Sequence, residues 1–297
     1  MSYDEVALKV RRMREDMAQI AELAPTLKTD SDFMPHLVKC MNFVLYLLRQ
    51  AASLAPTADV AEKGFTRRRA IVVGHLVRTQ KLYEGYLLHL VRREGELCAI
   101  LGRLLIETVT RMEYLLNART GTFRHFVLIS YRPEREQLQD LERKQRNRPL
   151  LPIEKRMLGS LKIRMKRDGV TRKNLSDNRQ WDLDGKNFRA MLEALQRPAA
   201  AYTYGFAASS HWVHGDWRDL SYFHLRRTSR FYHPKLEFDD TDPRYAGPTT
   251  IVVLRGLYSY LKKTKVDPDR FFTSVVAELL QLIETLDAAH EETLHAG

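Results

Sequence analysis

The chain has 297 residues, of which 44% are hydrophobic, so it can bury a sizeable core without disulfides or bound metals. Its formal net charge is +11, and from Arg119 to Lys173 sixteen Lys and Arg face six Asp and Glu, so this basic segment carries nearly all of the excess. Two cysteines exclude a disulfide framework, and neither has the spacing of a zinc ligand. A concentrated positive charge favours a polyanionic partner, whereas the alternative is a solvated surface in a chain with more Arg than Lys.

Hydrophobic residues recur every three or four positions along most of the chain, which predicts amphipathic helices. In chain order these cover 3–24, 31–54, 59–93, 94–118, 122–147, 153–167, 187–214 with a restart at Pro198, 249–263 and 268–293. Residues 170–185 and 230–249 predict loops, with at most a short hairpin near 221–240. The sequence therefore predicts an all-α fold, an irregular bundle of about nine helices. We expect one domain over 1–297, with residues 120–185 as a protruding basic insertion.

The first residues of the chain are charged and contain no apolar core, so they do not resemble a secretory signal. The longest apolar run covers residues 43–48, far below the ~20 residues that span a bilayer. Cys40 and Cys98 lie within apolar helical patterns, which predicts buried thiols. We expect a cytoplasmic protein in a reducing compartment that contacts no membrane.

The densest cluster of reactive side chains is SSHWVHGDWRDL, which holds two of the three tryptophans and two of the ten histidines. On a helix, His211 and His214 share a face, and Ser210 lies one turn before His214. Gly215 would end that helix, and a helix C-terminus favours a protonated imidazole. This spacing predicts an acid/base site.

Asp216 and Trp217 follow this helix end and are expected to be binding residues of the same site. Two other interpretations stay open. The cluster can be a structural cap whose histidines are hydrogen-bonded and whose tryptophans pack. It can also be a pair of metal-binding histidines, although no third ligand is evident. We expect no metal and no cofactor.

Arg103 and Glu107 interrupt the apolar pattern of residues 94–118. Charges on such a helix either pair within a buried network or line a cleft. An Arg that precedes a Glu by one turn is the weaker orientation for a local ion pair, so each residue is expected to have another partner. We predict that Glu107 lies within hydrogen-bonding reach of Arg103, His211 or His214.

Motifs that define common enzyme classes are absent: the sequence has no Walker A loop, GxGxxG, GxSxG elbow or HExxH. The charges of the basic segment alternate in REQLQDLERKQR, which predicts an exposed helical face. Four cations within this stretch or just after it are expected to be exposed and to contact phosphates, namely Arg143, Lys144, Arg146 and Arg148.

Three stretches of the chain, GRLLIETVTRMEYLL, YTYGFAASSHWVHGDWRDL and DDTDPRYAGP, resemble a bacterial family catalogued as a domain of unknown function. In that family the patterns R-x-x-x-E, S-x-x-x-H-G-x-W-x-D-L and D-P-R recur together, and the resemblance covers about residues 60–290. On this chain they fall on Arg103, Glu107, Ser210, His214, Gly215, Trp217, Asp219, Leu220, Asp242, Pro243 and Arg244. The resemblance implies a helical fold and a shared site, but no reaction.

A weaker resemblance is to HEPN-type helical ribonucleases and abortive-infection proteins, whose signature is an Arg followed shortly by a His. Six such pairs occur in this Arg-rich chain against roughly three expected by chance, and adjacent arginines account for the excess. Arg119 with His125, at the edge of the basic segment, is the pair that we retain. By analogy, this resemblance favours a role in stress or phage defence.

The leading prediction is a protein whose polar cleft binds an anionic ligand or nucleic acid. The cleft would be formed by Arg103, Glu107, Ser210, His211 and His214. One alternative is a non-enzymatic module that docks a partner through the basic segment, and self-association is also open. A second alternative is a metal-independent, HEPN-like ribonuclease, which would need an Arg–His pair near the basic surface.

Overall fold

The computed structural model describes residues 3–207 and 209–296 of the chain. They form two compact units: the first contains the described residues within 1–116 and 192–297, and the second contains residues 117–191. The predicted insertion, 120–185, falls inside the second unit. Apart from one two-stranded hairpin, the described residues form helices and loops, which confirms the all-α prediction.

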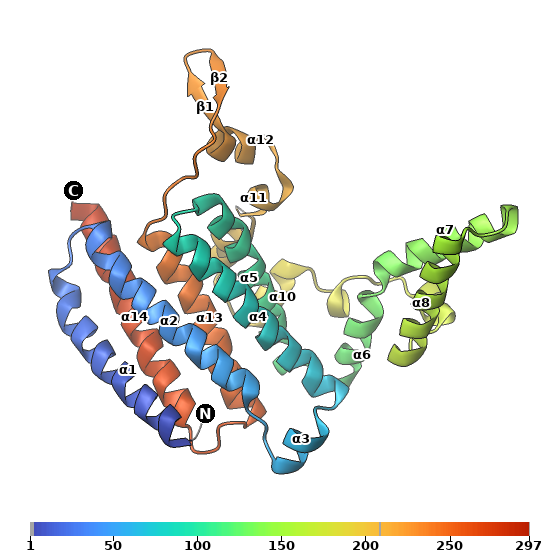
Figure 1. The fold of residues 1–297 in the computed structure, drawn as a ribbon, viewed down its shortest axis with the longest axis horizontal. Helices are drawn as coiled ribbons and strands as arrows, with labels where there is room; N and C mark the ends of the chain where they lie inside the picture. The colour runs from blue at the N-terminus through green and yellow to red at the C-terminus, as the bar shows by residue number, and fades with distance from the viewer. Residues whose placement is uncertain (1–2, 208, 297) are drawn as a thin grey trace. The chain divides into compact units, whose positions relative to one another are not determined.

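Six long helices build the first unit, and their tyrosines and aliphatic residues form its core (Figure 1). They are α1 (Tyr3–Leu23), α2 (Asp30–Ser53), α4 (Arg67–Val91), α5 (Gly95–Leu116), α13 (Pro243–Thr264) and α14 (Phe271–Ala296). Helix α5 packs against both α4 and α13, and α2 packs against α4, α13 and α14. Buried hydroxyls join α4 to α13, since Tyr83 shares a 2.9 Å hydrogen bond with Thr250 and Tyr86 donates to the carbonyl of Tyr245.

In chain order, most of the shorter elements of the first unit come after α10 (Phe188–Ala194) and before α13. The two units meet in the sequence within α10. The shorter elements are η1 (Ala24–Thr26), α3 (Ala58–Lys63), η3 (Ala201–Ala207), α11 (Ser210–His214), α12 (Trp217–Asp219), η4 (Leu220–His224), β1 (Leu225–Thr228) and β2 (Phe231–Pro234). The strands pair antiparallel, with Arg227 opposite Tyr232, and the hairpin extends away from the long helices (Figure 1).

The second unit has its own apolar core. Its elements are α6 (Thr120–Ile129), α7 (Arg132–Asn147), α8 (Pro152–Asp168), α9 (Arg172–Asp177) and the single turn η2 (Leu183–Gly185). Helix α7 packs against α8 and α9. The buried side chains are Tyr131, Leu138, Leu141, Leu150, Leu158, Leu161, Met165, Val170 and Leu175.

The expected count of about nine helices is wrong, because the described residues contain α1 to α14. Two long predicted helices are broken. Residues 59–93 divide at Gly64, whose φ of +84° suits only glycine, and residues 122–147 divide between Ile129 and Arg132. The hydrophobic periodicity did not indicate these breaks, because the same apolar pattern continues on both sides of each break.

Two predicted loops contain helix. Helix α9 forms within 170–185, where Thr171 caps it by accepting from the backbone N–H of Asn174. Helix α13 begins at Pro243 instead of at 249, because Asp242 accepts from the N–H of Arg244 and proline suits the first turn. The predicted helix after Pro198 becomes η3 and the short α11, and it also runs through residue 208, which lies outside the described residues.

Cys40 and Cys98 are buried free thiols, as predicted, and burial raises the pKa of each to about 12. Within residues 3–207 and 209–296, no helix combines the length and the apolar character needed to cross a bilayer.

Candidate functional site

Helix α5 places Arg103 and Glu107 on the face that η3 covers. The Arg103 guanidinium lies 3.0 Å from the centre of the Phe206 ring, and burial lowers its pKa. Glu107 accepts from Arg103 at 3.2 Å and pairs with Arg111 at 2.5 Å. The predicted reach of Glu107 to Arg103 is therefore present. The other partner expected for Glu107 is Arg111, which lies on α5 like Arg103.

Helix α11 carries the predicted histidines. Ser210 donates to the carbonyl of Phe206 at 3.3 Å, so its hydroxyl points to the preceding turn and not to His214. The Nδ1 atom of His211 contacts the carboxylate of Asp216. The side chain of His214 is exposed and makes no hydrogen bond within the described part of the chain.

Gly215 ends α11 with φ +61°, as the sequence predicted. The two predicted constellations are neighbours because α11 and η3 both pack against α5. A Cβ on Gly205 would lie 3.7 Å from the terminal methyl of Ile106, so the contact there is apolar. Across residues 3–207 and 209–296, no hydrogen bond or ion pair joins Glu107 to His211 or His214. The shared polar cleft therefore stays a prediction.

Asp216 is the N-cap of α12 and accepts from the backbone N–H groups of Arg218 and Asp219 at 2.9 and 3.3 Å. Its bond to His211, together with these N–H groups, lowers the pKa of the Asp216 carboxyl. Beside it, Trp217 leaves 56% of its surface exposed and meets the ring of Tyr232 edge to face at 5.3 Å. Capping therefore accounts for Asp216, whereas nothing in the fold requires an exposed indole.

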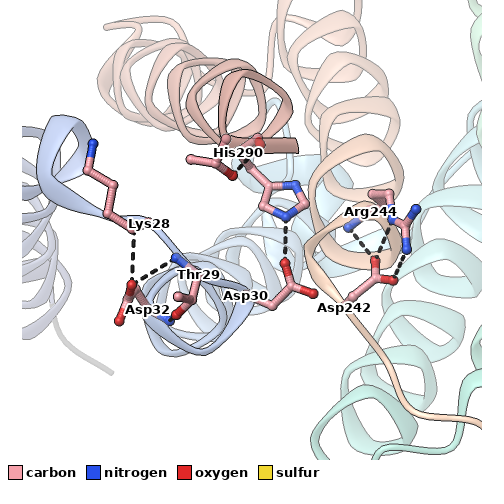
Figure 2. Close-up of polar contacts among 8 residues, drawn as sticks. Lys28, Thr29, Asp30, Asp32, Asp242, Arg244 and His290 are labelled. Carbon is pink, nitrogen blue, oxygen red and sulfur yellow. Dashed lines mark hydrogen bonds and ion pairs between the residues drawn. The ribbon is translucent and has the colours of Figure 1, made fainter. Parts of the chain in front are cut away.

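The D-P-R stretch of the resemblance has a structural role. Figure 2 shows Asp242 facing Arg244 at the start of α13, with side-chain hydrogen bonds of 2.6 and 3.2 Å. Nearby, buried His290 of α14 bonds to Asp30 of α2 at 2.8 Å (Figure 2). These contacts cap one helix and join two others, which explains the residue types without a ligand.

His125, the histidine of the retained Arg–His pair, uses both ring nitrogens within the second unit. Its Nδ1 accepts from the backbone N–H of Asp184, and its Nε2 lies 3.1 Å from the carbonyl of Gln180. Both bonds form with the neutral Nε2–H ring. The ring thus fixes the segment around η2 on α6, and it would have to leave this position to transfer a proton to a substrate.

Of the four cations predicted to contact phosphates, three are paired with carboxylates. Arg143 and Lys144 each lie 2.7 Å from Asp140. Arg148 grips Glu154 with two bonds of 2.7 and 2.8 Å. Glu154 is buried and also accepts from the N–H of Leu151, so Arg148 holds the start of α8 in place. Arg148 is therefore expected to have a structural role in addition to the predicted phosphate contact.

Replacement of Glu154 by Gln is expected to flatten the acid dependence of the second unit's stability. Arg148 and the Leu151 N–H lower the pKa of Glu154 from 4.5 to about 2. A lowered carboxyl pKa stabilises the fold above pH 4.5, and this contribution disappears as the pH falls toward 2. The variant should be less stable than the wild type at neutral pH, and this difference should disappear near pH 2.

Urea unfolding followed by circular dichroism from pH 7 to pH 2 measures this difference. Glu136→Gln is the matched control, since no ion pair of Glu136 occurs in the described part of the chain. A pH-independent gap between the Glu154 variant and wild type would contradict the prediction.

A hollow of about 750 Å³ lies between the end of α7 and the face of α8. Its polar lining consists of Gln145, Arg146, Asn147, Arg148, Lys155 and Lys162, and we call it the basic groove. Lys155, Gly159 and Lys162 lie on one face of α8, since they are four and three residues apart. A Cβ on Gly159 would meet nothing within 4 Å, so the groove is open there.

Lys155 and Lys162 were not identified from the sequence. Their spacing places both lysines on one face of a helix with Gly159 between them, and this pattern could have indicated the site. Arg146, Lys155 and Lys162 are all exposed, and none forms an ion pair with any described residue. In the basic groove, these three side chains are therefore the cations whose charge remains available to a ligand.

Comparison with known proteins assigns the chain to a family, although it finds no characterised relative. Neither the curated proteins nor the solved structures contain a match. A family model described as "Family of unknown function (DUF5677)" matches residues 69–232, just over half of the chain. This range includes the basic groove, α11, α12 and the hairpin as far as Tyr232, and it excludes the D-P-R stretch. The chain belongs to this family of unknown function, DUF5677.

Proposed function

We propose that the protein binds nucleic acid through its phosphates in the basic groove. The supporting observation is that Arg146, Lys155 and Lys162 surround one hollow and have no carboxylate partner among the described residues. An unpaired cation can bind a phosphate at little cost in free energy, because no existing ion pair has to break. Phosphate contacts of this kind supply most of the affinity of non-specific nucleic-acid binding.

The charge of the surrounding unit supports the same proposal. The second unit contains 19 Lys and Arg against nine Asp and Glu, a balance of +10, whereas the first unit carries +1. Such a field raises the local concentration of a polyanion and speeds its association.

The composition of the groove indicates what it recognises. Its lining contains no aromatic ring, and its other polar groups are the amides of Gln145 and Asn147. Rings would be needed to stack on unpaired bases, whereas cations and amides suit phosphate oxygens. We infer that the groove follows the backbone of a duplex without selecting a sequence.

Two other functions are less well supported. A ribonuclease of HEPN type needs a free histidine, whereas both ring nitrogens of His125 bond to backbone groups. An anion site at Arg103 competes with Phe206 and Glu107, which already cover its guanidinium.

Docking of an acidic protein would use the same cations of the basic groove, so it is one outcome of the test. A role in stress or phage defence stays a prediction by analogy.

The salt dependence of binding tests the proposal. For labelled duplex DNA, the logarithm of the association constant should fall with the logarithm of salt concentration by about 0.9 for each phosphate neutralised. The triple variant Arg146→Gln, Lys155→Gln, Lys162→Gln should flatten this slope by about 2 to 3, because each lost contact removes roughly one unit.

The control variant Lys9→Gln, Arg11→Gln, Arg12→Gln removes three exposed charges from α1 in the first unit and should leave the slope unchanged. Absence of binding at low salt, or equal slopes for the groove variant and wild type, would overturn the proposal. Binding of an acidic peptide with a higher affinity than the duplex would assign the groove to a protein partner.

A further inference from the structure

A second surface, in the first unit, combines exposed rings with unpaired cations. In the hairpin, Arg227 lies opposite Tyr232, and residues that are opposite in an antiparallel pair project from the same face. The ring of Trp217 meets Tyr232 at 5.3 Å with an angle of 78° between the ring planes. Trp217, Tyr232 and Arg227 therefore belong to one face of the hairpin, and we call this face the hairpin platform.

The rings of the platform are fixed and yet accessible. Trp217 is 56% exposed and Tyr232 is 43% exposed. An edge-to-face contact holds both rings in place. The ring that contributes its edge keeps both of its flat faces uncovered. A flat ligand can stack there without displacing a packed side chain.

The charge of the platform is positive. Residues 217–235 contain five Arg and Lys and a single acidic residue, Asp219, which is buried and lies 3.4 Å from His224. Arg218 and Arg227 are exposed, and the described part of the chain provides no carboxylate for either of them. An anionic partner would therefore find a ring beside two guanidinium groups that no carboxylate neutralises, although Arg227 donates its Nε–H to the carbonyl of Ser229 at 3.2 Å.

We propose that the hairpin platform binds single-stranded nucleic acid, with a base stacked on the Trp217–Tyr232 pair and the neighbouring phosphates held by Arg218 and Arg227. Unpaired bases present flat faces, whereas the bases of a duplex are already stacked on one another. The proposal does not depend on the basic groove, since the two surfaces lie in different units and use different chemistry.

Other occupants fit less well. A second copy of the chain would place two positively charged hairpins against each other. An anionic membrane would need an uninterrupted apolar face to insert. Phe231 is exposed in the hairpin, but Arg226 projects from one face, Arg227 from the other, and Arg230 occupies the turn. An acidic peptide matches the charge but brings no ring of the size of a base.

Tryptophan fluorescence of the full chain tests the proposal, because Trp217 is one of only three tryptophans. Oligothymidylate should quench the emission, and inorganic polyphosphate at the same phosphate concentration should not. In Trp217→Leu the quenching should disappear. Affinity measured by anisotropy should fall about 5- to 150-fold for Trp217→Leu and for Tyr232→Ala, the range expected for one lost base stack.

Trp181→Phe is the matched control, since this tryptophan packs in the second unit and its loss should leave the quenching in place. The triple groove variant should also keep it, so failure of the groove does not remove the platform. Circular dichroism verifies that each variant is folded, and Tyr232→Ala tests the platform independently of Trp217.

Four results would overturn the proposal: equal quenching by polyphosphate, quenching that persists in Trp217→Leu, no loss of affinity in Tyr232→Ala, or stronger quenching by phosphatidylserine vesicles than by oligothymidylate. The last result would assign the platform to a membrane surface.

Discussion

Replacement of Gly159 by glutamate is expected to lower the affinity for duplex DNA by about 10- to 100-fold at low salt. The new carboxylate would project into the basic groove between Lys155 and Lys162, where a Cβ meets nothing within 4 Å. At an effective dielectric constant near 20, a carboxylate about 6 Å from a phosphate costs roughly 2 to 3 kcal/mol. It would also pair with the lysines that the phosphate needs.

The same substitution should not unfold the second unit. Glutamate is a better helix former than glycine by roughly 0.5 to 1 kcal/mol in a helix interior, and Gly159 lies in the middle of α8. Loss of binding together with an unchanged or higher melting temperature would identify an effect on the groove alone.

Gly121→Glu supplies the matched control. Gly121 is exposed in the first turn of α6, and a Cβ there also meets nothing within 4 Å. This variant introduces the same charge into the same unit without lining the groove. If both variants weaken binding equally, net charge controls affinity and the groove has no special role.

Replacement of Gly256 by alanine is expected to lower the free energy of unfolding of the first unit by about 1 to 3 kcal/mol. Gly256 lies in the buried face of α13, where an added Cβ would overlap the Cγ1 atom of Val109 on α5. Relief of this overlap requires Val109 to leave its rotamer or α5 and α13 to separate, and these helices form one of the main contacts of the core.

Gly74→Ala tests whether this loss comes from packing. Gly74 lies in α4, is exposed, and would offer a Cβ open space. Alanine there should raise stability by up to about 1 kcal/mol, since it favours the helix and displaces nothing. Urea unfolding monitored by circular dichroism compares the two variants. Equal effects would show that Gly256 does not set the distance between α5 and α13.

The two units differ in what they offer a partner. The first unit is nearly neutral and exposes rings at its hairpin, whereas the second unit is strongly basic and exposes cations around a hollow without rings. Both surfaces fall almost entirely within the residues that the family model matches. Rings select unpaired bases and cations select phosphates, so separate variants can assign a role to each surface.

The amino-acid sequence alone determined the helical character of the chain, because amphipathic periodicity depends only on which residues are apolar. It also located the excess charge between Arg119 and Lys173, the buried cysteines and the end of α11 at Gly215, all of which follow from composition or local backbone preference. The exposure of Trp217 could not be read from its residue type, since most tryptophans pack.

Only the tertiary structure decided which charges are available to a ligand. Arg143 and Lys144 pair with Asp140 three and four residues earlier on α7, which helical spacing alone could have indicated. The pair between Arg148 and Glu154 links two elements, and Arg146 has no carboxylate partner among the described residues. Glu154 lies in the first turn of α8 and reaches Arg148, at the end of α7, because α7 and α8 pack together. Likewise, Lys155 and Lys162 become part of a site because the end of α7 lies opposite them. Hollows, and ion pairs that join two elements, depend on the distance between those elements, and helical periodicity contains no information about that distance.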